Sequence, residues 1–211
     1  MRSSAFRSAV AGLLLILVLL NSPANAEDAP IVGRLIADFT LPDTHGRPRS
    51  LSEADDAPAV VIAFLGTECP LARTYGRRLG ELAREYGARG VVFAGIDANQ
   101  QDSLTEVSAY ATRCEIDFPM LLDARHEVAD QFGAQRTPEV FILDANRVVR
   151  YHGRVDDQYG IGTQRTAPQR RDLAITLDEI LEGRPVSVPS TQTSGCIIGR
   201  RRSIEPHGET T

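Results

Sequence analysis

Two runs of consecutive apolar residues stand out in the first half of the chain. Residues 59–65 (AVVIAFL) and 91–96 (VVFAGI) are rich in β-branched side chains and carry no charged residue. Such runs are typical of strands that are buried on both faces of a sheet. Between them, the apolar residues from Pro70 to Tyr86 recur at the spacing of one helical face, and two glycines follow. The pattern predicts a strand, a helix and a second strand.

The alternation of extended and helical segments continues along the chain. Further helices are expected at about 102–113, 126–132 and 173–181, and extended segments at 118–122, 140–143 and 148–151. Strands that alternate with helices predict an α/β layered sheet. A polar insertion at about 156–169 is expected to be a solvated loop. The Pro-, Ser- and Thr-rich stretch after Gly183 is expected to be an irregular extension.

The N-terminus has the three parts of a secretory signal peptide. A basic start with Arg2 and Arg7 precedes the apolar run 9–20, and a small-residue pattern ends at Ala26. We expect cleavage after Ala26 and export to the periplasm or the medium; an uncleaved membrane anchor is the alternative. The expected organisation is a signal peptide at 1–26, one domain at 27–184 and a C-terminal extension at 185–211 that carries Cys196.

Charge and composition exclude several classes of function. All 23 basic residues of the 211 are arginine, so mechanisms based on a lysine Schiff base or a P-loop lysine are excluded. The formal net charge is −5, and loss of the two arginines of the leader would make the chain more acidic. An acidic chain binds nucleic acid poorly because phosphates repel it. Three cysteines are an odd number for a fully paired exported domain.

Cys69 is the strongest candidate for chemistry. It lies between the first apolar run and a predicted helix, in GTECPLART, and Pro70 suits the first helical position. A cysteine at a helix N-terminus meets free N–H groups and the positive end of the helix dipole, which favour the thiolate. The neighbouring Glu68 opposes this effect, and Arg73, one turn on, could oppose Glu68. The alternative is a buried structural cysteine.

On these residues the chain resembles the thioredoxin-like superfamily, in its exported redoxin (AhpC/TSA, peroxiredoxin-like) branch. The resemblance covers about residues 31–182, with the opening VGRLIADFTLPDTHGRPRSLSE as entry segment. It implies a thioredoxin-like fold, with a single domain built on a central mixed β-sheet flanked by helices. It also implies that Cys69 is the attacking cysteine. Thr137 and Pro138 then fall where thioredoxins carry a cis-proline loop that faces the cysteine and the substrate backbone.

The chain departs from both parent patterns at defined positions. Where thioredoxins have the second cysteine of C-x-x-C, this chain has Ala72, and Glu68 replaces the usual tryptophan. Thr67 is one residue closer to Cys69 than the threonine of the peroxiredoxin loop. The peroxiredoxin arginine would fall on Pro138, with Arg136 nearby. The complete mechanism of neither the thioredoxins nor the peroxiredoxins is therefore expected here. Candidates for tuning the pKa of the Cys69 thiol are Thr67, Glu68 and Arg73.

The other two cysteines leave the mechanism open. A nucleophilic cysteine that forms a mixed disulfide or a sulfenic acid needs a second thiol to resolve it. Cys196, which follows a glycine on a flexible segment of the extension and could therefore travel to Cys69, is one candidate for that role, and Cys114 is another. The alternatives are a structural Cys114–Cys196 disulfide, or cysteines that stay unpaired or pair between molecules. Cys114, at the end of a predicted helix, can also be an ordinary buried residue.

The sequence therefore predicts an exported oxidoreductase that uses Cys69 in thiol–disulfide exchange, with Thr137 and Pro138 shaping the substrate face. A peroxiredoxin-like thiol peroxidase and a non-catalytic redoxin-fold module that binds a partner are the alternatives. The expected partners are a protein or small-molecule disulfide or a peroxide, together with an external thiol reductant; nucleic acid and a stable membrane anchor are not expected. No cofactor is expected, and the four histidines show no metal-ligand spacing.

Overall fold

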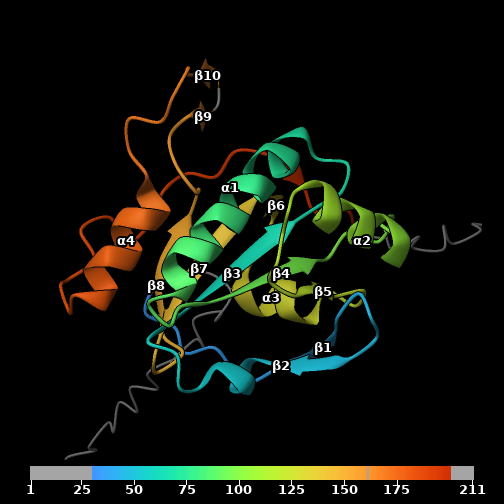
Figure 1. Cartoon of the computed structure of the whole chain (residues 1–211), viewed down its shortest axis with the longest axis horizontal. Helices are drawn as coiled ribbons and strands as arrows, with labels where there is room; N and C mark the ends of the chain where they lie inside the picture. Colours follow the sequence, from blue (N-terminus) through green and yellow to red (C-terminus); the bar gives the residue numbers. More distant parts are fainter. Residues whose placement is uncertain (1–29, 161, 201–211) are drawn as a thin grey trace, which may run out of the picture.

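The protein is described by a computed structural model that covers residues 30–160 and 162–200. Its centre is a five-stranded mixed sheet with the order β5-β4-β3-β7-β8 (Figure 1). The strands are β3 (Ala59–Leu65), β4 (Val92–Asp97), β5 (Met120–Leu122), β7 (Glu139–Asp144) and β8 (Val149–Gly153). β3 pairs in parallel with β4 and antiparallel with β7. All seven residues of β3 are buried, as expected for the middle strand of a covered sheet.

Helices cover both faces of the sheet (Figure 1). They are α1 (Pro70–Gly87), α2 (Leu104–Arg113), α3 (Glu127–Phe132) and α4 (Asp172–Leu181). Side chains of α1, α2 and α4 form one core with alternate residues of β3, such as Val61 and Leu65. The other residues of β3, including Ile62 and Phe64, form the second core with α3. The alternation of side chains along β3 thus divides one apolar run between two cores.

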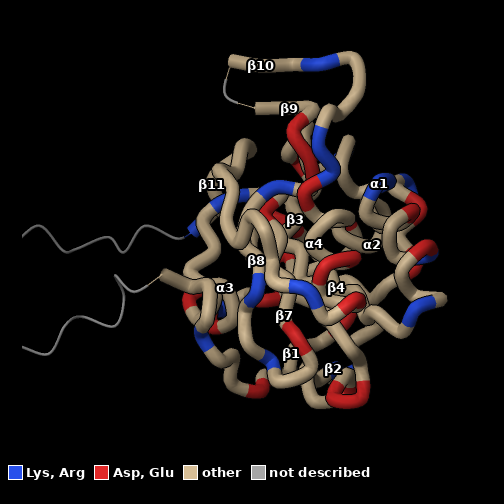
Figure 2. The backbone as a smooth tube through the Cα atoms, turned by 90° about the vertical axis from the view of Figure 1, so that its left-hand side faces the viewer, with Lys and Arg blue, Asp and Glu red and all other residues tan. Residues whose placement is uncertain are grey.

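Smaller elements complete the structure. Strands β1 (Thr40–Pro42) and β2 (Pro48–Ser50) form a hairpin, which a 3-10 helix, η2 (Leu51–Ala54), follows. Strands β9 (Tyr159–Gly160) and β10 (Thr163–Gln164) pair in a hairpin that projects from the body in both views (Figures 1 and 2). The two-residue strands β6 (Arg136–Thr137) and β11 (Cys196–Ile197) also pair with each other. This last pair brings the C-terminal extension onto the domain.

The predicted α/β architecture and each of its main strands and helices are confirmed. Two expectations were wrong. The insertion after β8 is not simply a solvated loop, because Asp156 is buried and pairs with Arg78 of α1, while the Tyr75 hydroxyl donates to it at 2.7 Å. The extension after Gly183 is not irregular throughout, because it contains β11.

The predicted signal peptide, residues 1–26, lies outside the described residues. Among the residues that the structure describes, no helix is long and apolar enough to cross a membrane.

Candidate active site

Cys69 lies where the central strand meets the first long helix. It is the N-cap residue of α1, with extended backbone, and Pro70 occupies the first turn, where its missing N–H removes no helical hydrogen bond. The side chain is only 3% exposed. Its Sγ lies 2.9 Å from the backbone oxygen of Thr137. The fold therefore brings the predicted nucleophile into contact with the predicted proline loop, 68 positions later in the chain.

The Thr137–Pro138 peptide bond is cis, as the resemblance implied. The loop that leads to it is held by Glu139, whose Oε2 accepts hydrogen bonds from the backbone N–H groups of Gln135 and Arg136, both at 2.8 Å. The other carboxylate oxygen of Glu139 meets the ring of His152 on β8 at 2.5 Å. The buried carboxylate thus fixes the loop against the sheet, which keeps the Thr137 carbonyl directed at Cys69.

The C-terminal strand β11 lies on the outer edge of this loop. Cys196 is opposite Thr137, and Ile197 is opposite Arg136. The strand is fastened on both sides of Cys196, because Arg136 Nη1 donates to the Gly195 oxygen at 3.0 Å and Ile198 N donates to the Gln135 oxygen at 2.9 Å. The Ile198 side chain is buried in the second core. Cys196 is therefore held at the loop rather than on a loose tail.

Gly195 makes this close approach possible. Its φ is +152°, and a Cβ at this position would lie 2.1 Å from the Thr137 backbone oxygen, a distance that no real side chain tolerates. Glycine is therefore required by both the backbone conformation and the contact. The glycine before Cys196 fits the strand to the loop, where the sequence had suggested only freedom of movement.

Cys69 and Cys196 line the same cavity, and their thiols differ in acidity. Burial opposes ionisation of Cys69, but hydrogen bonds from the Cys196 side chain and from the backbone N–H groups of Ala72 and Cys196 outweigh it and lower the pKa of Cys69. Cys196 is exposed as a residue, but partial desolvation of its thiol, together with the neighbouring Cys69 sulfur, raises the pKa of Cys196 to about 11. Cys69 is therefore the thiol of the pair that ionises more readily, and Cys196 is the one that keeps its proton to higher pH.

Two of the predicted tuning residues, Thr67 and Arg73, hold the loop before Cys69. Thr67 is buried; its backbone N–H donates to Asp102 Oδ2 at 2.9 Å, and its oxygen accepts from Arg73 Nε at 3.0 Å. Glu68 is exposed, and among the described residues Arg73 donates to the Thr67 oxygen and not to Glu68. Arg73 thus stabilises the loop backbone, where the sequence had suggested that it opposes the charge of Glu68.

Cys114 lies apart from this pair of cysteines. It is buried at the end of α2, where its Sγ lies 3.7 Å from the Arg73 oxygen, and a Cβ on Gly76 would approach that sulfur to 3.1 Å. Burial raises the pKa of the Cys114 thiol, which makes it a poor nucleophile. The structure brings Cys196 to Cys69 and leaves Cys114 packed against α1.

Sequence reasoning missed a polar cluster beside this loop. Asp97 ends β4, and Asn99 and Asp102 follow it. Asn99 contacts both the segment before Cys69, at the Leu65 oxygen, and Gly199 of the extension. The stretch IDANQQD at the end of an apolar strand was the available signal, since polar residues at the carboxyl end of a parallel strand lie at the edge where sites form.

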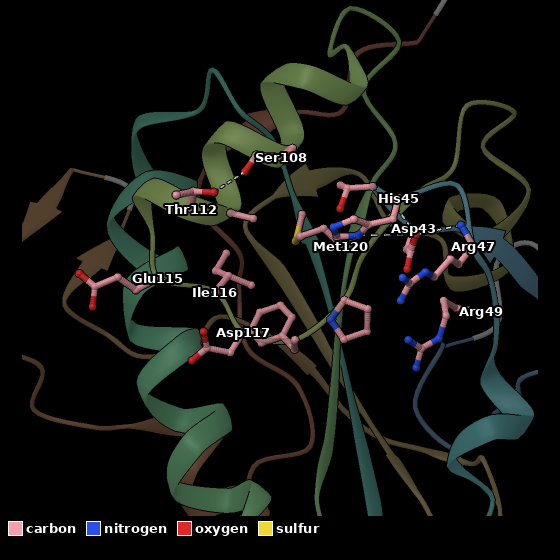
Figure 3. A pocket seen from close by; sticks show the side chains of 14 residues that line it. Asp43, His45, Arg47, Arg49, Ser108, Thr112, Glu115, Ile116, Asp117 and Met120 are labelled. Carbon is pink, nitrogen blue, oxygen red and sulfur yellow. Dashed lines mark hydrogen bonds and ion pairs between the residues drawn. The ribbon is translucent and has the colours of Figure 1, made fainter.

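An open cavity of about 350 Å³ gives access to the two cysteines, and it is lined by Cys69, Pro70, Leu71, Arg136, Thr193, Ser194, Gly195 and Cys196. A larger groove of about 650 Å³ lies elsewhere, between the β1–β2 turn and the α2–β5 connection. Figure 3 shows Arg47 and Arg49 on one side of this groove and Glu115 and Asp117 on the other. No cysteine lines the larger groove, so the thiol chemistry belongs to the smaller cavity.

Comparison with known proteins agrees with this site. The model of the AhpC/TSA family matches residues 32–152, more than half of the chain. The chain belongs to the AhpC/TSA family. A Mycobacterium tuberculosis protein, provisionally named a peroxiredoxin, is 30% identical over 127 residues, which are 56% of this chain and 80% of that protein. Thiol-disulfide oxidoreductase ResA of Geobacillus thermodenitrificans is 27% identical over 122 residues, 58% of this chain and 68% of ResA.

Solved structures extend the likeness beyond the matched segment. An uncharacterised conserved protein from Geobacillus kaustophilus has a TM-score of 0.75 and 29% identity, over 82% of this chain and 93% of that one. The fold is thioredoxin-like and the protein is an oxidoreductase. The family match ends at residue 152, so β11 and Cys196 lie outside it.

Proposed function

We propose that this protein is a thiol–disulfide oxidoreductase that cycles between a Cys69/Cys196 dithiol and a Cys69–Cys196 disulfide. The observation that carries the proposal is the position of Cys196, which β11 holds against the Cys69 thiol across Thr137. Cys196 then supplies the second thiol that Ala72 does not. Thr137 and Pro138 are buried and flanked by β11 in the described structure, and they form the substrate face when β11 moves away from the loop.

The proposed reduction of a disulfide has two balanced steps. The Cys69 thiolate attacks one sulfur of the substrate, which forms a mixed disulfide and releases the other sulfur as a thiolate that takes up a proton. Cys196 then loses its proton and attacks the Cys69 sulfur, which releases the second substrate thiol. The substrate gains two electrons, the protein is left as the Cys69–Cys196 disulfide, and an external thiol reductant restores the dithiol.

The acidity of the two thiols supports this order of events. The Cys69 thiolate is stabilised by a hydrogen bond from Cys196, and the same charge disfavours ionisation of Cys196. In a mixed disulfide Cys69 carries no charge, so this repulsion disappears and Cys196 ionises more readily. The second cysteine is thus held back until the first has reacted. The name of the relative ResA also agrees with thiol–disulfide exchange.

The test is to equilibrate the protein in glutathione redox buffers, alkylate the free thiols and map the peptides without reduction. We expect one disulfide, Cys69–Cys196, with Cys114 alkylated after unfolding. Cys196→Ser should accumulate a mixed disulfide at Cys69, and Cys69→Ser should form none. A disulfide between Cys114 and Cys196, or no reaction at Cys69, would overturn the proposal.

A second candidate, reduction of hydroperoxides, is favoured by the burial of Cys69. With β11 docked, Cys69 is 3% exposed and is approached through the cavity of about 350 Å³, which suits a small oxidant better than a protein disulfide. In this reaction the Cys69 thiolate takes an oxygen from the peroxide, releasing an alcohol or water, and Cys196 condenses with the sulfenic acid to release water. Parallel rates of Cys69 oxidation by hydrogen peroxide and by a disulfide separate the two activities, with Cys69→Ser as the control.

We also propose that the protein works outside the cytoplasm, because residues 1–26 read as a signal peptide. An exported site meets oxidising conditions, in which the disulfide form accumulates unless a reductant is supplied. Determination of the N-terminal residue of the protein purified from the periplasm tests this proposal. A chain that keeps Met1 and stays in the cytoplasm would contradict it.

A further inference from the structure

We propose that Asn99 is the positioning residue of the cysteine pair: its single amide joins the segment that leads to Cys69 and the segment that follows Cys196. The inference rests on the proposed function, and it concerns what keeps the two thiols together.

One side of the amide holds the C-terminal extension. Asn99 Oδ1 accepts a hydrogen bond from the backbone N–H of Gly199 at 2.9 Å. The next residue, Gln100, donates its own N–H to the Gly199 oxygen at 3.1 Å. Both backbone groups of Gly199, three residues after Cys196, are therefore bound to the loop that follows β4. These bonds continue the docking of β11 beyond its two-residue strand.

The other side of the amide faces the segment before Cys69. Asn99 Nδ2 lies 3.3 Å from Asp102 Oδ2, which accepts the Thr67 N–H at 2.9 Å, and 3.5 Å from the Leu65 oxygen. Gly66 leaves room for this contact, because a Cβ on Gly66 would lie 2.5 Å from Nδ2. The absence of a side chain two residues before Glu68 thus lets the amide reach the backbone of the Cys69 loop.

The chemistry of the residue matches its place. Its oxygen meets an N–H group and its nitrogen meets three oxygens, the third being Asp97 Oδ1 at 3.4 Å. Asp97 Oδ1 also accepts the Asn99 backbone N–H at 2.8 Å, which fixes the start of the side chain. Asparagine offers an acceptor and two donors on one short side chain, so it satisfies both segments at once. Asn99 is 8% exposed, and loss of the amide would leave these groups unpaired.

Asn99 contacts the backbone of the Cys69 loop, whereas the hydrogen bond of the Cys69 sulfur goes to the Thr137 oxygen. Loss of the Asn99 amide is therefore expected to lower the effective concentration of the Cys196 thiol at Cys69, and to leave the intrinsic reactivity of Cys69 unchanged. This distinction separates positioning from a general structural role, because a distorted Cys69 loop would change the reactivity of Cys69 whether or not Cys196 is present.

The experiment measures the equilibrium constant of the Cys69–Cys196 disulfide against glutathione in the full chain. Asn99→Ala removes the amide, and Gly199→Pro removes the N–H that the amide accepts. Gly199→Ala keeps the N–H, and its Cβ displaces only the end of the flexible Gln101 side chain. Gln131→Ala removes an amide that binds the Ala37 oxygen away from both cysteines. We expect the constant to fall at least about tenfold in the first two variants and to stay within about twofold in the two controls.

A second measurement follows alkylation of Cys69 in a Cys196→Ser background, where Asn99→Ala should leave the rate and its pH profile unchanged. If the wild type forms the disulfide and Asn99→Ala and Gly199→Pro leave its equilibrium within twofold, the positioning role is wrong. A changed Cys69 profile in the Cys196→Ser background would also overturn it. If the wild type forms no Cys69–Cys196 disulfide, the proposed function itself fails.

Discussion

Cys196 lies directly opposite Thr137 in the antiparallel pair of β11 and β6, and the Thr137 oxygen lies 2.9 Å from the Cys69 sulfur. One backbone residue thus contacts both cysteines. In the sequence these three residues are separated by 68 and 59 positions, and no local motif joins them. The site is therefore a product of strand pairing, in which β11 completes the surroundings of a helix N-terminus.

Removal of the Cys196 thiol should make Cys69 less acidic. The hydrogen bond from the Cys196 side chain is the largest of the effects that lower the pKa of Cys69, and Cys196→Ala deletes it. We expect the alkylation profile of Cys69 to shift to higher pH and its rate at neutral pH to fall. Cys114→Ala is the matched control and should leave the profile in place. An unchanged profile in Cys196→Ala would show that the two thiols do not interact.

Substitution of Gly195 should loosen β11. In Gly195→Ala the new Cβ meets the Thr137 oxygen, and the residue must adopt a φ of +152°, so we expect a cost of about 1–3 kcal/mol in docking the strand. Hydrogen exchange at the Ile198 N–H should become faster, and the Cys69–Cys196 disulfide less stable. Gly183→Ala is the control, because Gly183 also has a positive φ but has no atom near its Cβ position. Equal effects in both variants would contradict the close approach at Thr137.

Asp97 should make the fold less stable as the pH rises. Burial and the nearby side chain of Asp102 raise the pKa of Asp97 from 3.8 to about 8, and its Oδ2 accepts no hydrogen bond from the described residues. The folded state therefore keeps a proton that the unfolded chain has already lost. Between about pH 4 and 8, this group alone should lower the free energy of unfolding by up to about 1.4 kcal/mol per pH unit.

Asp97→Asn mimics the protonated acid and should remove this dependence. We expect urea unfolding of the variant to show a flatter pH profile and greater stability at pH 8 than the wild type. A wild-type stability that does not fall between pH 5 and 8, or an Asp97→Asn profile parallel to that of the wild type, would show that the carboxyl is ionised in the folded protein.

Cys114 should matter for stability and not for redox chemistry. Its sulfur fills the space beside Gly76 and the Arg73 oxygen, so Cys114→Ala leaves a small void and should lower the free energy of unfolding by about 1 kcal/mol. The disulfide equilibrium with glutathione should be unchanged. A loss of disulfide formation in this variant would show that Cys114 takes part in the redox reaction.

The central elements could be predicted from the sequence because their signals are local. The run AVVIAFL is buried along its whole length in β3, and the helical spacing after Pro70 fixes α1 and thereby the place of Cys69. The partner of Cys69 could not be predicted this way. β11 has only two residues, and its position depends on Gly195 and on the loop before Pro138, which are distant in sequence. Asn99 was missed for a similar reason, because no local sequence pattern predicts its hydrogen bond with Gly199, which lies 100 positions later in the chain.

Cys69 and Cys196 are 127 residues apart, so a bond between them would enclose most of the described chain in one covalent ring. Closing a ring of this size restricts the unfolded chain strongly, by about 5 kcal/mol in the chain-entropy model. Thermodynamic linkage makes two free energies equal. The increase in the free energy of unfolding on oxidation equals the amount by which folding favours formation of the Cys69–Cys196 disulfide. Resistance to unfolding is then itself a measure of the oxidation state of the site.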